Sequence, residues 1–169
     1  MGNLGVWVAP TFLESLMKKR KDELNMQYFC IAPWSHVLAH VDNSTNLCCM
    51  SVLGGTGIRR NDGSGDYLVS DADFLFYFNS EVVRDIRRRM LAGEYMPECH
   101  KCIDRVEKVG GESMRNRLNE LCLVEFSVDY EFTEDPIPPQ TLDLRFSSEC
   151  NLRCRMCSPM ASTRWARDR

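Results

Sequence analysis

The sequence predicts an α+β protein, on the basis of three features. The alternating stretch from Trp34 to Val41, the turn residues "DNST" and the segment "NLCCM" together are typical of a β-hairpin. Several later segments carry apolar residues at helical spacing. The stretch "TLDLRFS" at 141–147 then alternates again, as a short strand does. With 169 residues, the chain is long enough for one ordinary domain or two small ones.

The predicted helices have recognisable ends. Thr11 and Glu14 form a capping box, and the apolar residues after Thr11 predict a short helix that ends at "KKRK". Asn79 or Ser80 caps a second helix, which Gly93 ends. Two further short helices are predicted at positions 99 to 108 and 113 to 122.

The helix after Ser80 has two different faces. Val83, Ile86 and Met90 fall on one face, whereas its arginines fall largely on the other. We interpret this arginine run as a solvated helix face rather than as a phosphate-binding stripe. The arginines concerned are Arg84, Arg87 and Arg88.

Composition shifts predict the domain boundaries. Glycine and polar residues between 54 and 66 predict a loop, and three prolines within 133–140 predict a linker. We therefore divide the chain into a helical lead-in, a cysteine-rich domain, a linker and a new unit. Their ranges are 1–25, 26–132, 133–140 and 141–169.

Charge and cysteine content exclude several classes of protein. A net charge of -3 argues against nucleic acid as a partner, and no apolar run approaches the ~20 residues of a membrane helix. Nine cysteines, an odd number, fit poorly with a disulfide framework, and the N-terminal basic cluster follows its apolar run, unlike a signal peptide. We expect a cytoplasmic protein whose clustered cysteines bind metal or do redox chemistry.

The first cysteine set is Cys150, Cys154 and Cys157, which lie within eight residues. Three thiolates can hold three irons of a 4Fe-4S cluster and leave the fourth iron open for a substrate or cofactor. Zinc would need a fourth ligand from elsewhere. The three histidines, His36, His40 and His100, are all distant in sequence.

The sequence "ECNLRCRMC", which follows a predicted strand, resembles the cluster motif of radical S-adenosylmethionine (SAM) enzymes. The resemblance implies that 141–169 begin a partial (β/α) radical SAM barrel. It also implies that the open iron chelates SAM and that an electron, from a donor such as flavodoxin or ferredoxin, cleaves SAM to a 5′-deoxyadenosyl radical that abstracts a substrate hydrogen. Met156 stands where the family often has an aromatic residue near the adenine, which a methionine can also contact.

The second cysteine set is dispersed along the chain. The segments "FCIAPW", "NLCCM" and "ECHKC" together could supply four ligands, and a zinc knuckle is the alternative to an iron-sulfur cluster. The residues concerned are Cys30, Cys48 or Cys49, Cys99 and Cys102.

The segment 90–119 resembles proteins with a twitch domain, a shortened relative of the SPASM domain that holds an auxiliary 4Fe-4S cluster. The family pattern implies Cys30 as the first ligand, Asn43 in place of a glycine and Cys48 as the second ligand. Cys49 is then a neighbour. Asparagine tolerates the left-handed turn conformation better than most residues.

The remaining histidines and Cys122 are given structural roles. His36 and His40 are interpreted as one face of a strand, and His100 as a residue outside the metal ligands. Cys122 is interpreted as a buried thiol.

The resemblance implies an oxidoreductase-type radical SAM protein with two 4Fe-4S clusters that acts on a peptide or small metabolite. We expect the chain alone to be inactive, because one strand and the start of one helix cannot close a barrel. The alternative is a zinc- or cluster-binding interaction module. Its C-terminal arginines would then meet an acidic or nucleic-acid partner.

Overall fold

The structure is a computed structural model. It describes residues 19–51, 57–71, 74–125, 131–135, 139–145, 147–150, 152–155, 157, 159 and 162–167. The helix predicted after Thr11 and the predicted adenine contact Met156 lie outside these residues. Within the described ranges, no helix is both long and apolar enough to cross a membrane.

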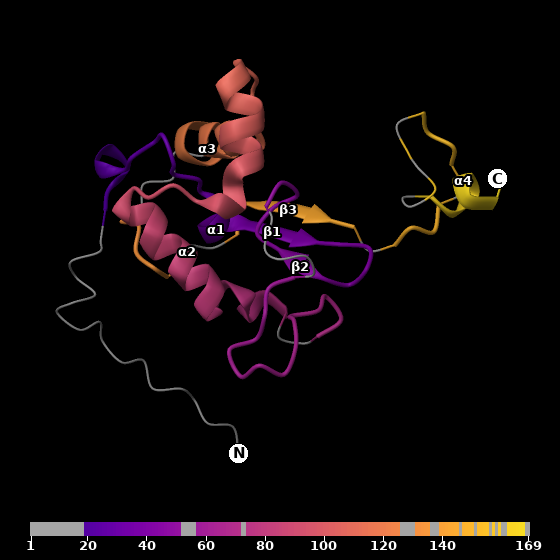
Figure 1. The fold of residues 1–169 in the computed structure, drawn as a ribbon. Helices are drawn as coiled ribbons and strands as arrows, with labels where there is room; N and C mark the ends of the chain where they lie inside the picture. Colours follow the sequence, from indigo (N-terminus) through magenta and orange to yellow (C-terminus); the bar gives the residue numbers. More distant parts are fainter. Residues whose placement is uncertain are drawn as a thin grey trace.

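The described elements make an α+β fold (Figure 1), in which η denotes a short 3-10 or π helix. The strands are β1 (His36–Ala39), β2 (Thr45–Asn46) and β3 (Thr141–Leu144). The α helices are α1 (Ala32–Ser35), α2 (Glu81–Ala92), α3 (Met114–Glu120) and α4 (Thr163–Arg167). The short helices are η2 (Lys21–Glu23), η3 (Phe74–Asn79), η4 (Pro97–Cys99), η5 (Lys101–Val106), η6 (Glu107–Val109) and η7 (Leu121–Glu125).

The predicted hairpin is present, but it is shorter than predicted. β1 and β2 are antiparallel, with Leu38 opposite Asn46. Trp34 and Ser35 were expected in the strand, but they lie in α1. Pro33 is in the first turn of α1, where proline is well tolerated because its missing N–H is not needed there. All four residues of β1 are buried, so the expected alternation is wrong. The reason is that β1 is the central strand and is covered on both faces.

β3 pairs with β1 in parallel, so the sheet has the order β2-β1-β3. His36 lies opposite Thr141, and the two side chains share a hydrogen bond of 2.6 Å between Nδ1 and Oγ1. The strand that was expected to open a new unit is therefore hydrogen-bonded into the N-terminal sheet. Its apolar face is open rather than covered, because Leu142 and Leu144 are exposed.

Three aromatic rings form the centre of the core. Phe29, Trp34 and Phe132 are fully buried, and their ring centroids are 5.1 to 5.6 Å apart. The Trp34 indole donates a hydrogen bond of 2.7 Å to the Thr133 carbonyl. This contact fixes the chain after Phe132 against α1, which packs against both α2 and α3.

α2 has the predicted ends, with Ser80 as N-cap and Gly93 as a left-handed C-cap. Its apolar face is buried as predicted, but Arg87 is also fully buried and does not belong to a solvated face. Arg87 donates hydrogen bonds to the carbonyls of Pro33 (2.9 Å) and Glu134 (2.6 Å). The arginine run thus holds part of the predicted linker against the core, and Arg84 adds an ion pair with Glu134.

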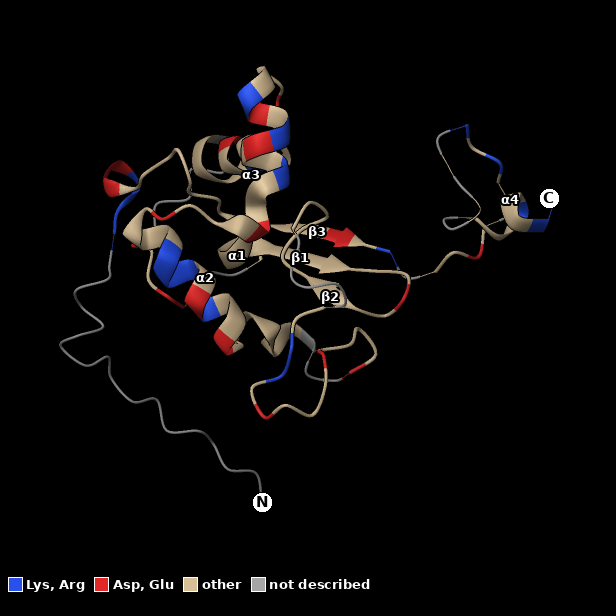
Figure 2. Ribbon diagram, viewed as in Figure 1, with Lys and Arg blue, Asp and Glu red and all other residues tan. Residues whose placement is uncertain are grey.

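The C-terminal segment lies apart from the helices that surround the sheet (Figure 1). It contains α4, whose first turn begins at Thr163. Figure 2 shows basic residues on α4, which are Arg164 and Arg167. Strand, cysteine loop and helix thus follow one another in the predicted order, and a barrel remains a prediction.

Candidate metal centre

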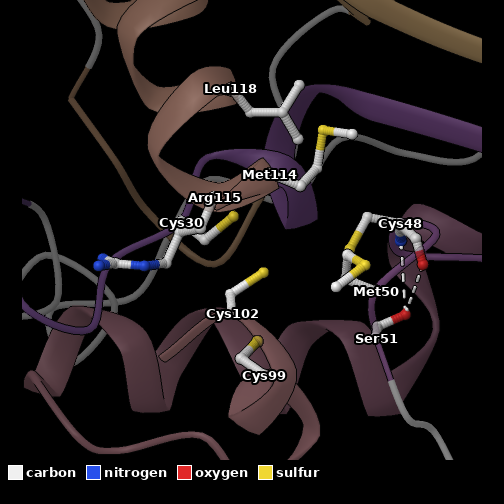
Figure 3. Close-up of a pocket in the computed structure, with 9 residues that line it drawn as sticks. All are labelled: Cys30, Cys48, Met50, Ser51, Cys99, Cys102, Met114, Arg115 and Leu118. Atoms are coloured by element: carbon white, nitrogen blue, oxygen red, sulfur yellow. Dashed lines mark hydrogen bonds between the residues drawn. The ribbon is translucent and has the colours of Figure 1, made fainter. Parts of the chain in front are cut away.

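All four predicted ligands of the second cysteine set line one pocket, which we call the four-cysteine pocket (Figure 3). The cysteines come from three regions of the chain that are far apart in sequence. The apolar part of the lining is Met50, Met114 and Leu118, and the polar part is Ser51 and Arg115. The ligands concerned are Cys30, Cys48, Cys99 and Cys102.

Cys30 is held by hydrogen bonds from α3 to its two neighbours. Asn119 donates to the Phe29 carbonyl (3.0 Å) and accepts from the Ile31 amide (2.8 Å). Arg115 donates to the same Phe29 carbonyl (3.0 Å). The main chain on both sides of Cys30 is therefore fixed by buried side chains of one helix.

Cys48 is placed by the turn of the hairpin and by a polar contact after it. Asn43 has φ 72°, so the left-handed conformation expected at this position is confirmed. Beyond β2, the Ser51 hydroxyl lies within hydrogen-bond distance of two acceptors, the carbonyl of Cys48 (2.9 Å) and Asn46 Oδ1 (2.8 Å). These contacts hold the short turn that directs Cys48 towards the pocket in Figure 3.

Cys99 and Cys102 lie at the junction of two short helices. Pro97 begins η4, and the Cys99 amide donates to the Met96 carbonyl at 2.9 Å. Because residues three apart lie on the same side of a helix, the C-x-x-C spacing presents both thiols to the pocket. His100, which lies between them, does not line the pocket and makes a contact of 3.0 Å from Nδ1 to the Pro97 carbonyl.

Burial raises the pKa of three of the pocket thiols. Desolvation, and then the neighbouring thiols, lift the pKa of Cys30 well above its ordinary value and that of Cys99 to about 12. Desolvation also raises the pKa of Cys48. Without metal these three thiols are thus protonated at neutral pH, and metal binding must release protons from them.

The donor set is four thiols, which both a zinc ion and an iron-sulfur cluster accept as ligands. In a tetrahedral zinc site with bonds of ~2.3 Å, the sulfurs lie about 4 Å apart. Across the described residues, no group of three or more His, Cys, Asp or Glu side chains is gathered to hold a metal ion. A cluster places irons and sulfides between its thiolates and so tolerates wider spacing.

The pocket has little free space around the thiols. Its cavity volume is ≈ 20 Å³, which is room for about one water molecule. A cluster therefore requires the side chains of the lining to turn outwards. Met50 and Met114 suit that change, because a methionine side chain is unbranched and adaptable.

The three-cysteine loop, which carries Cys150, Cys154 and Cys157, is organised by contacts close in sequence. The Cys157 amide donates to the Cys154 carbonyl (2.9 Å), and Thr163 Oγ1 accepts from the Cys150 amide (3.2 Å). The Trp165 indole donates to the Cys154 carbonyl (3.1 Å). Desolvation, followed by the charges of Cys154 and Cys150, raises the pKa of the Cys157 thiol. The Cys154 side chain is exposed, unlike the pocket thiols.

The other predicted residues lie outside both sites. Cys49 does not line the pocket, whereas its neighbour Cys48 does. Cys122 is fully buried, as predicted, with its sulfur 3.9 Å from the Ser35 hydroxyl. His36 is buried in β1, and His40 follows that strand.

Two residues of the site were missed in the sequence. Arg115 and Asn119 lie four residues apart, on the turns of α3 that also carry the apolar pocket residues Met114 and Leu118. Polar residues beside the apolar face of a predicted helix could have marked them, but nothing in the sequence connects them with Cys30, which lies more than 80 residues earlier. Comparison with known proteins adds no assignment, because no protein-family model, curated protein or solved structure matches the chain.

Proposed function

We propose that this chain carries the cluster-binding regions of a radical SAM enzyme and holds two 4Fe-4S clusters. The convergence of Cys30, Cys48, Cys99 and Cys102 on one apolar pocket is the observation that supports the auxiliary cluster. The spacing of Cys150, Cys154 and Cys157 between a strand and a helix supports the second. This cluster, when bound, supplies the electron that cleaves SAM, and the substrate is a peptide or small metabolite.

The chain's own residues contribute in different ways to the two sites. In the four-cysteine pocket, apolar side chains exclude water, while buried side chains of α3 orient Cys30. In the three-cysteine loop, Thr163 and Trp165 hold the main chain at Cys150 and Cys154. The Leu152 amide also donates to Cys150 Sγ at 3.4 Å, which helps to orient that sulfur.

Iron counting tests the two-site proposal. After anaerobic reconstitution, the chain should hold about eight irons and as many sulfides, by cluster stoichiometry. Substitution of Cys99 and Cys102 by alanine should halve both numbers and leave the other cluster's spectrum unchanged. The matched control is Cys122→Ala, which removes a thiol outside both sites. Loss of all iron, or of none, in the double variant contradicts two separate sites.

A second measurement tests the SAM-binding site. In a protein that joins these residues to a complete barrel, addition of SAM should alter the electron paramagnetic resonance signal of the reduced three-cysteine cluster, because that cluster has an open iron. In this chain alone the change should be weak or missing, because one strand and the start of one helix do not enclose the adenosine. The pocket cluster has four protein thiolates and should not respond. A protein that binds zinc alone at both sites, or a barrel-containing protein with iron clusters of which neither responds to SAM, would instead be the interaction module.

A further inference from the structure

The guanidinium of Arg115 is almost completely committed to protein groups. Its Nε donates to Glu107 Oε1 at 2.9 Å, and its Nη2 donates to the other oxygen of the same carboxylate. Its Nη1 donates to the carbonyls of Met26 (2.7 Å) and Phe29 (3.0 Å). Four hydrogen bonds thus fix one side chain that is only 6% exposed.

Glu107 is itself held in place beside Arg115. It also accepts a hydrogen bond from Ser113, the N-cap of α3. The contact connects the end of the C-x-x-C helices to the start of α3, because Glu107 begins η6 directly after η5. The ion pair therefore ties together two helical segments that both contribute residues to the lining of the pocket.

Stability alone is a poor account of this arrangement. A buried ion pair is often no more stabilising than apolar side chains of similar volume, because both charges lose their hydration. The planar guanidinium of an arginine does, however, donate its hydrogen bonds in fixed directions, and so it orients the groups that accept them. Here the contacted groups are the carbonyls of Met26 and Phe29, which lie four residues and one residue before Cys30.

Figure 3 shows the stem of Arg115 beside Cys30, with the guanidinium directed away from the cysteine sulfurs. Arg115 is therefore no ligand and acts through the main chain. We propose that Arg115, held by Glu107, is a positioning residue that fixes Cys30 in its ligand position before metal binds. The inference rests on the proposed function and adds the device that preorganises its auxiliary site.

The rate at which the pocket releases iron tests this role of Arg115. The measurement uses a background variant in which Cys150, Cys154 and Cys157 are replaced by alanine, so that only the pocket cluster remains. Arg115→Met keeps the apolar stem and removes the hydrogen bonds. It should release iron to a chelator at least about tenfold faster, the usual effect of removing a group that orients a ligand. The matched control is Arg117→Met on the same helix, whose arginine is exposed, and it should behave as the background does.

A double-mutant cycle separates positioning from general destabilisation. If Arg115 acts through Cys30, adding Arg115→Met to Cys30→Ala should change the release rate by less than about twofold, because coupled residues are not additive. A full additional tenfold effect in the double variant would overturn the inference. So would an Arg115→Met protein that releases iron at the background rate.

Hydrogen exchange of the metal-free protein provides a measurement that does not depend on the cluster. The amides of residues 26 to 31 should exchange faster in Arg115→Lys than in wild type, because one ammonium cannot replace the planar guanidinium. They should be unchanged in Arg117→Lys. Unchanged exchange in Arg115→Lys overturns the inference even if Arg115→Met does not fold. A wild-type protein that takes up no iron at the pocket would instead refute the proposed function.

Discussion

The four thiols of the buried pocket come from three separated parts of the chain, whereas the three thiols of the C-terminal loop lie within eight residues. Hydrogen bonds that span more than 80 residues hold the main chain around Cys30. The bonds at Cys150 and Cys154 span 13 residues or fewer. One site therefore depends on the whole tertiary fold, and the other on local chain geometry.

The largest expected difference between the two sites results from a change in the aromatic core. Trp34→Ala removes a fully buried indole and should lower the free energy of unfolding by about 3 to 5 kcal/mol. In urea titrations the four-cysteine pocket should lose its iron at a lower urea concentration than in wild type. The three-cysteine loop should be affected much less, because its contacts are local.

Trp165→Ala is the matched control, since it removes the other described tryptophan. Its indole contacts the Cys154 carbonyl on the exposed loop. We expect a change in stability of about 1 kcal/mol or less, the size of one hydrogen bond, with any loss of iron confined to the loop. If both tryptophan variants affected both sites equally, the two sites would form one cooperative unit.

An intermediate effect separates the adjacent cysteines of the hairpin. Cys48→Ala should lower the iron content of the pocket, because Cys48 lines it, whereas Cys49→Ala should leave that content unchanged. The measurement is iron per chain in the background that lacks the three loop cysteines. Equal losses, or a larger loss with Cys49→Ala, would overturn the assignment of Cys48 as ligand.

The smallest effect concerns the pH dependence of stability at the strand pair. Burial lowers the pKa of His36, so its contribution to stability is fully present above the unfolded pKa of about 6.5. As the pH falls below that value, the unfolded state takes up a proton first and the stability decreases, until the pH passes the folded pKa. His36→Gln should flatten this part of the curve in urea unfolding between pH 7.5 and 5. A curve with the same slope in His36→Gln would show that another group titrates.

The sequence alone was sufficient for features that depend on neighbouring residues. The ends of α2 follow from Ser80 and Gly93, since a cap acts within one helical turn. The family pattern implied the left-handed turn at Asn43, and asparagine tolerates that conformation better than most residues. The spacing of the loop cysteines is likewise local.

Only the tertiary structure decided the features that join distant segments. Arg87 and Arg84 have the same residue type on the same helix, yet Arg87 is fully buried because the carbonyls of Pro33 and Glu134 accept its hydrogen bonds. β3 alternates as a strand should, but its parallel pairing with β1 depends on a neighbour about 100 residues away. In the same way, Arg115 reaches the chain before Cys30 only because α3 packs against α1. Sequence patterns indicate which side chains are suited to burial, and long-range packing determines which residues those side chains contact.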